Sequence, residues 1–198
     1  ITGFGRTGPM FASEHEGLTP DFMTVAKGLT SGYAPMGAAL ISNGVYEVLA
    51  DAVPAGVPLG HGLTYSGHPV SAAVGLAVLK LYREGLIANA LAVGPYFEDR
   101  LRSLGDAPLG GDVRCKGLLG GIELVSDRET KAKFAPDRQI GPLLAAAGYR
   151  HGIIFRAFTD GTLGFAPPIC ITRMEIDRLI ARVADTLETV AGQLGRKG

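Results

Sequence analysis

The chain has 198 residues, of which 46% are hydrophobic and 19% charged, and its 29 glycines and 12 prolines show no collagen-like period. These values exclude disordered and fibrous proteins and predict a globular protein of one or two domains. Nineteen basic residues balance nineteen acidic ones, so no overall field favours nucleic acid or an anionic membrane as a partner. We therefore expect small-molecule ligands.

Several features indicate the cellular compartment and whether further polypeptide covers part of this chain. The longest uncharged segment, residues 52–79, is interrupted by prolines, histidines and glycines, which argues against a membrane span. Cys115 and Cys170 have apolar neighbours and no metal-type spacing, so we expect buried, reduced thiols in a cytoplasmic protein. The mean hydropathy of +0.22 predicts apolar surface that is covered by a partner subunit or by further chain. A start without methionine, directly before the glycine-rich residues 3–8, favours a piece of a longer protein.

The first half of the chain predicts short strands followed by helices. Residues 22–26 and 37–42 are expected to form two strands, the first of them buried. A helix is expected from Pro69, which suits a first helical turn, to about residue 83. Because residues 70–79 are apolar all round, this helix is predicted to be buried.

A further helix is predicted to begin near Pro95, with an apolar face that ends at Leu104. Residues 105–111 are rich in glycine and proline and mark the expected boundary between a large domain, residues 1–104, and a small one, residues 105–198. The whole is an α/β mixture.

The second half predicts strands and two helices. The surest helix begins with a capping box formed by Thr172 and Glu175 and continues as an apolar stripe to Leu194. The other expected elements are one or two strands within residues 113–125, a helix over 140–147, and strands at 152–158 and 162–165 joined by a turn at Asp160-Gly161.

Lys27 stands between an apolar strand and a glycine-rich stretch. A lysine at the end of a buried strand is partly desolvated, which lowers the pKa of its amine and favours attack on a carbonyl, as a Schiff-base lysine requires. The alternative is a lysine at the end of a strand that extends to water.

Three ordered blocks resemble class III aminotransferases, the branch of fold-type I pyridoxal-phosphate (PLP) enzymes that includes the ω-amino acid:pyruvate transaminases. They are Gly-Phe-Gly-Arg-Thr-Gly at residues 3–8, Pro-Asp at 20–21, and Ala-Lys-Gly-Leu at 26–29. The resemblance implies that Lys27 is covalently linked to PLP. It also implies the C-terminal portion of the large domain followed by the small C-terminal α+β domain.

Residues 60–69 place hydroxyls and small side chains just before the predicted helix at Pro69. Free N–H groups and the helix dipole suit an anion there, although an ordinary capping loop is the alternative. In the similar transaminases the threonine of this block reaches the PLP phosphate of the neighbouring subunit. The resemblance therefore implies that role for Thr64, with the Leu63 N–H as a second donor, in a homodimer with a shared active site.

Arg156 lies on a predicted strand among apolar residues. A guanidinium in such surroundings needs an anion, and its planar fork matches a carboxylate, so either a substrate or a structural acidic residue could be its partner. The resemblance implies that Arg156 binds the substrate carboxylate. The four histidines have no metal-like spacing, so no metal site is expected.

The resemblance implies a PLP-dependent aminotransferase that moves an amino group from an ω-amino acid or amine to a keto acid such as pyruvate. The residues that would hold the pyridine nitrogen and stack on the ring are expected before Ile1, so we expect the isolated chain to be inactive. Two alternatives stay open: another class III enzyme of the aminomutase or dialkylglycine decarboxylase type, or a noncatalytic fragment that keeps the fold.

Overall fold

The computed structural model of the chain describes residues 1–54 and 60–195, and it divides into two units. The first unit comprises Ile1–Gly5 with Pro9–Ile87, and the second comprises Arg6–Gly8 with Ala88–Gly198. The division lies earlier than the boundary expected after residue 104, because the helix that precedes that point packs into the core of the second unit. The assignment of the two parts to a PLP-binding domain and a small domain stays a prediction.

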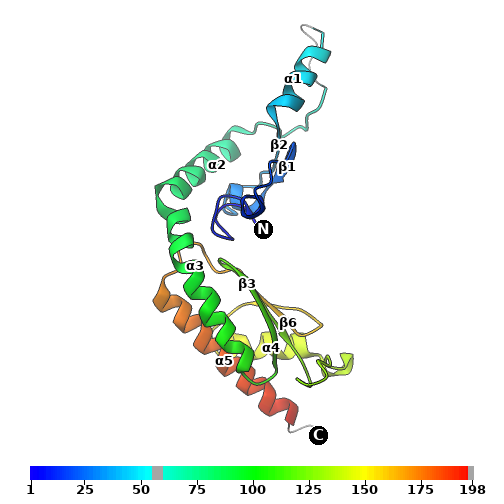
Figure 1. Ribbon diagram of the computed structural model, residues 1–198, viewed down its shortest axis with the longest axis vertical. Coiled ribbons are helices and arrows are strands. Elements are labelled where there is room, and N and C mark those ends of the chain that lie inside the picture. The colour runs from blue at the N-terminus through cyan, green and yellow to red at the C-terminus, as the bar shows by residue number, and fades with distance from the viewer. Residues whose placement is uncertain (55–59, 196–198) are drawn as a thin grey trace. The chain divides into compact units, whose positions relative to one another are not determined.

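The first unit combines a strand pair with two longer helices (Figure 1). The strands are antiparallel, with Phe22 opposite Ile41 and Val25 opposite Ala38, and both expected strands are confirmed. In chain order the elements are η1 (Ala12–Glu16), β1 (Phe22–Val25), η2 (Lys27–Leu29), β2 (Ala38–Ile41), α1 (Asn43–Ala52), α2 (Pro69–Leu81) and the π-turn η3 (Tyr82–Leu86).

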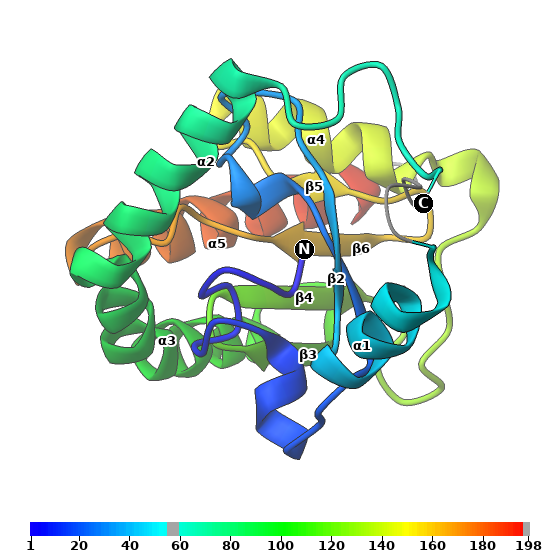
Figure 2. The same ribbon diagram turned by 90° about the horizontal axis from the view of Figure 1, so that it is seen from above.

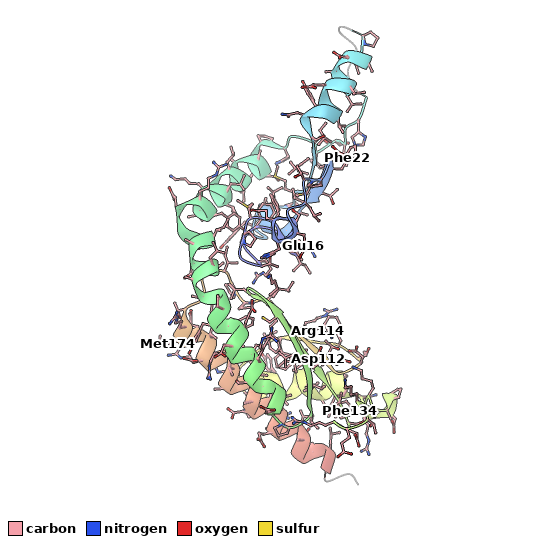
Figure 3. All side chains as sticks on the ribbon, viewed as in Figure 1. Glu16, Phe22, Asp112, Arg114, Phe134 and Met174 are labelled. Atoms are coloured by element: carbon pink, nitrogen blue, oxygen red, sulfur yellow. The ribbon has the colours of Figure 1, made fainter. Side chains whose placement is uncertain are left out.

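Two burial predictions for this unit are wrong for the part of the chain that the structure describes. Phe22 of β1 is 66% exposed and projects from the strand pair (Figure 3). Helix α2 buries only Gly75 and Val78, while Leu76 on another face is 70% exposed. The apolar composition of these segments predicted that they are buried. The strand pair and the helix are too small to cover all of each other's apolar side chains.

The helix expected near Pro95 begins earlier, as α3 (Ile87–Arg102), with Pro95 in its interior. Gly85 adopts φ 151°, ψ −16° and separates α2 from α3. Pro95 indicated a helix start because proline is common in the first helical turn. Inside α3 its lack of an N–H leaves one backbone hydrogen bond unformed, and the helix continues.

The second unit is an antiparallel sheet in the order β3-β4-β6-β5 with helices along it (Figure 2). The strands pair directly, except for an irregularity between Gly110 and Asp112. After α3 its elements are η4 (Ser103–Asp106), β3 (Gly110–Lys116), β4 (Leu119–Leu124), η5 (Pro136–Arg138), α4 (Ile140–Arg150), β5 (Arg156–Ala157), β6 (Thr162–Phe165) and α5 (Arg173–Gly195). The predicted strand over residues 152–158 pairs only at its end, in β5.

The core of this unit lies between the helices and one face of the sheet. Ile122 of β4 and Leu163 of β6 are opposite each other and fully buried, together with Phe97 of α3, Leu144 of α4 and Val183 of α5. Because side chains alternate along a strand, their neighbours in sequence face away from the helices. This second face carries Arg156.

The cysteine prediction is half wrong. Both thiols are free, but Cys170 is exposed and only Cys115 is partly buried. Burial is the main cause that raises the pKa of the Cys115 thiol to about 12, and the nearby carboxylate of Glu98 adds to it. Within residues 1–54 and 60–195, no helix combines the length and the apolar character that a bilayer crossing requires.

Candidate active site

Lys27 lies on the turn that follows β1, where the chain leaves the strand pair. It is the first residue of η2 and adopts φ +53°, a left-handed conformation that is uncommon for a residue with a side chain. Its side chain is exposed and forms no hydrogen bond or ion pair with any residue that the structure describes. The expected desolvation by a buried strand is therefore wrong for this chain, while the amine is free for a ligand.

The residues that follow Lys27 are buried and hydrogen-bonded, so they fix the turn in place. Leu29 is 8% exposed and Thr30 is 2% exposed, and the Thr30 hydroxyl donates to the Ala34 carbonyl. Helix α2 approaches through Gly75, where a Cβ would lie 3.7 Å from the Leu29 carbonyl oxygen. The backbone at Lys27 is therefore fixed by its buried neighbours, while its exposed side chain is free to move.

The segment that contains Leu63 and Thr64 is a turn before the N-terminus of α2. The Leu63 N–H donates to Ser66 Oγ at 2.9 Å, so an anion bound there would share or replace that acceptor. The Thr64 side chain is exposed and has no hydrogen-bond partner in the described part of the chain. His68 caps α2 by accepting from the Ser71 N–H at 3.4 Å. The Thr64 hydroxyl is thus available beside a helix N-terminus, a position that suits a phosphate, and the Leu63 N–H would have to leave Ser66 or share it.

Arg156 lies in β5, on the face of the sheet that the helices leave uncovered. The register places Arg156 opposite Gly164, Gly164 opposite Gly121, and Gly121 opposite Arg114. Two arginines therefore stand at the ends of one row, with two glycines between them. Glycine within a strand marks a place where another group approaches the sheet closely.

The two arginines of this row differ in their partners. Arg114 lies close to Asp112 on β3 (Figure 3), at 3.3 Å, and its guanidinium is 3.0 Å from Glu123 Oε2. Arg156 meets no carboxylate among the described residues, and its guanidinium carbon lies 5.3 Å from the centre of the Phe158 ring. A structural ion pair, one of the alternatives for Arg156, is therefore absent from this part of the chain. Its cation is available to an external anion.

The structure thus places Lys27, Leu63 and Thr64 in the first unit and Arg156 in the second. No hydrogen bond joins Lys27 to Leu63 or Thr64 within the described residues. Sequence reasoning missed the glycine row. The glycines inside strand patterns were the available signal, but their opposition appears only once the register is known.

These donors match a ligand that carries an aldehyde and a phosphate. The free amine of Lys27 can form a covalent bond to an aldehyde carbon, and the Thr64 hydroxyl and Leu63 N–H can donate to phosphate oxygens. The chemistry of the donor set therefore fits PLP. Within residues 1–54 and 60–195, no cluster of three or more His, Cys, Asp or Glu side chains could hold a metal ion.

Sequence comparison gives a consistent family. The family model Aminotransferase class-III matches residues 1–187. An uncharacterized aminotransferase of Sinorhizobium fredii is 45% identical over 201 residues, covering all of this chain and 43% of the relative. A putrescine–pyruvate aminotransferase of Pseudomonas aeruginosa is 40% identical, covering 96% of this chain and 41% of the relative. The chain thus spans less than half the length of these relatives.

Structural comparison agrees. The crystal structure of an ω-transaminase from Pseudomonas jessenii in complex with PMP superposes with a TM-score of 0.90 at 39% identity. The match covers 100% of this chain and 44% of that protein. The expected fold, a portion of a fold-type I transferase, is confirmed.

Proposed function

Because this chain belongs to the class-III aminotransferase family, whose members depend on PLP, we propose that it carries the covalent lysine of a transaminase. The enzyme would move an amino group from an ω-amino acid or amine to a keto acid such as pyruvate. The pyruvate-dependent relative supports the acceptor. Since the chain spans less than half of its relatives, the activity of the whole protein is part of the proposal.

One observation carries the proposal. The chain aligns along its whole length with an aminotransferase, and within it Lys27 lies on a left-handed turn. Its amine is exposed and forms no bond with the described residues. A lysine that only extends to water would also be exposed and unpaired, so the alignment of the chain with aminotransferases is what favours the covalent role.

Each site residue receives one role in this proposal. When bound, PLP supplies an electron sink that stabilises negative charge on the carbon that bears the amino group. Lys27 Nζ would hold the cofactor covalently and, once an amine substrate displaces it, would take a proton from that carbon. The Thr64 hydroxyl and Leu63 N–H would donate to the phosphate. Arg156 would bind the carboxylate of the keto acid with two parallel hydrogen bonds.

We also propose that the enzyme is a homodimer in which Thr64 serves the active site of the partner subunit. The apolar exposure of the first unit supports a covering surface: Tyr46 is 62% exposed, Leu63 81% and Tyr65 80%. A cytoplasmic location stays a prediction.

Borohydride trapping tests the central claim. In the full-length enzyme that contains this chain, reduction in the presence of PLP should label Lys27, as peptide mapping by mass spectrometry would show. Lys27→Ala should abolish the label and transamination with every amine. Lys80→Ala, which removes an exposed lysine of the same unit, should change neither.

Other outcomes separate the alternatives. A label on another lysine, or activity in Lys27→Ala, would refute the assignment. A label on Lys27 without amino transfer to any keto acid would instead favour an aminomutase or a decarboxylating enzyme. No label at all would favour a noncatalytic relative.

A further inference from the structure

Gly28, the residue directly after Lys27, is held by two aromatic side chains from distant parts of the first unit. Tyr82, the first residue of η3, donates its hydroxyl proton to the Gly28 carbonyl oxygen at 2.7 Å. Phe4, in the glycine-rich loop near the N-terminus, stacks on the Tyr82 ring with centroids 5.6 Å apart and an interplanar angle of 24°. Both side chains are more than nine-tenths buried. We call Phe4 and Tyr82 the aromatic clamp.

The clamp acts on Gly28, the residue directly after Lys27. A Cβ at Gly28 would lie 2.7 Å from Phe4 Cδ2 and 2.9 Å from Phe4 Cβ, so only glycine fits against this ring. The Gly28 carbonyl also accepts from the Ser31 N–H at 3.2 Å. With two donors and a ring against it, this peptide has little freedom to rotate.

This restraint bears on Lys27 because its conformation is unfavourable by itself. At φ +53° the Cβ of an L-residue crowds its own backbone, so an unrestrained lysine would relax to negative φ. Since Gly28 directly follows Lys27, such a relaxation would displace Gly28 from these contacts and redirect the Lys27 side chain. A strained residue persists only where its surroundings hold it in place.

We propose that Tyr82 and Phe4 are positioning residues that keep Lys27 left-handed and thereby aim its amine at the cofactor aldehyde. The inference rests on the proposed function of Lys27. Tyr82 acts through the Gly28 carbonyl, and Phe4 acts through its contact with Gly28 and through its stacking on Tyr82. The turn of irregular helix at Tyr82–Leu86 fits this role, since π-turns are frequent at functional sites.

The test uses the full-length enzyme and the variant Tyr82→Phe, which keeps the ring and removes only the hydroxyl. After apoenzyme is mixed with PLP, the absorbance band of the PLP–lysine bond should appear about fivefold more slowly, as expected for the loss of one hydrogen bond that orients the amine. The affinity for pyridoxamine phosphate, which has no aldehyde and forms no bond to lysine, should stay within about twofold.

Tyr96→Phe is the matched control. The Tyr96 hydroxyl also donates a hydrogen bond over 2.7 Å, to Asp177 Oδ1 in the second unit. The Tyr96→Phe substitution therefore removes a hydrogen bond of the same length at a position that does not contact Gly28. We expect a comparable change in thermal unfolding and an unchanged rate of bond formation. Equal rates in the two variants would overturn the inference, as would a parallel loss of pyridoxamine phosphate affinity in Tyr82→Phe, since that outcome indicates a damaged pocket.

A second variant covers the case in which Tyr82→Phe does not fold. Gly28→Ala should also slow bond formation, because the new methyl group collides with Phe4, whereas Gly44→Ala, on an exposed face of α1 with no atom within 4 Å, should not. A normal rate in Gly28→Ala would contradict the inference. If borohydride fails to label Lys27 in the unsubstituted enzyme, the proposed function itself fails, which distinguishes the two failures.

Discussion

At the scale of single residues, the contrast between Arg156 and Arg114 is the most informative feature of the second unit. Both lie on the uncovered face of the sheet, in one row with Gly121 and Gly164. Arg114 is neutralised by two carboxylates, whereas Arg156 contacts the face of Phe158 and no carboxylate within the described residues; a carboxylate is the stronger partner for a guanidinium. The pair therefore supplies both a proposed site residue and its control.

Arg156→Ala should raise KM for a keto acid about 10- to 100-fold, as expected for the loss of a charge-assisted bidentate contact, and should leave KM for an uncharged amine within about threefold. Arg114→Ala should change neither value, because its partners are structural. Steady-state kinetics of the full-length enzyme with both substrates would measure this. Equal effects of Arg156→Ala on the two substrates would remove the proposed role.

The two cysteines should react differently. At neutral pH the thiol of Cys115 is protonated, because burial raises its pKa to about 12, and access to it is restricted, whereas Cys170 is exposed. Iodoacetamide should therefore label Cys170 in the native protein and Cys115 only after unfolding, as mass spectrometry of the peptides would show. Rapid native labelling of Cys115 would contradict this burial.

At the scale of elements, a side-chain cap was a more reliable signal than apolar content or than Pro95, which lies inside α3. The capping box of α5 forms as predicted: the Thr172 N–H donates to Glu175 Oε2 at 2.8 Å, and the Glu175 N–H donates to Thr172 Oγ1 at 3.3 Å. Ser42 caps α1 in the same manner, by accepting from the Val45 N–H at 3.4 Å, but that helix was not predicted. A cap is a contact between residues close in sequence, so it can be predicted from a few residues.

The cap of α5 should make stability depend on pH. The Thr172 N–H is the main cause that lowers the pKa of Glu175 below its ordinary value of 4.5 in the folded state. The stabilisation is therefore fully present above about pH 4.5 and is lost as the pH falls through the lower folded value. Glu175→Gln should lower Tm at pH 7, and the difference from the unsubstituted protein should shrink towards pH 3.

Glu188→Gln is the control, because Glu188 is exposed on the same helix and its side chain has no hydrogen-bond partner among the described residues; it should show no such pH-dependent difference in Tm. A Glu175→Gln difference that is constant from pH 7 to pH 3 would show that the charged cap contributes nothing.

At the scale of the whole molecule, the proposed sharing of active sites can be tested by mixing inactive subunits. Lys27→Ala lacks the proposed covalent lysine, and Thr64→Ala lacks the proposed phosphate donor. If Thr64 serves the partner, a mixed dimer contains one site with Lys27 from one subunit and Thr64 from the other, and that site is complete.

After subunit exchange at limiting PLP, the mixture should therefore exceed the mean activity of the two variants and approach a quarter of the unsubstituted value at random pairing, roughly one intact site in every second dimer. Light scattering would confirm the dimer, and mixing without exchange is the control. A mixture that stays at the mean would place Thr64 in the site of its own subunit.

Sequence alone determined the local features of this protein. Alternation and periodicity predicted β1, β2, β6, α4 and α5, although not α1, because these patterns depend on neighbours a few positions apart. The order of short blocks around Lys27, Leu63 and Thr64 indicated the family, which the comparisons confirmed. Their roles, like that of Arg156, stay predictions.

Only the tertiary structure decided which surfaces are covered and which distant residues meet. The apolar faces of β1 and α2 remain exposed in the described chain, because burial depends on what packs against an element and not on its composition. The clamp of Phe4 and Tyr82 on Gly28 joins residues up to 78 positions apart, and the pairing of Gly121 with Gly164 depends on strand register. Such contacts follow from the path of the backbone in space, which no short window of sequence contains.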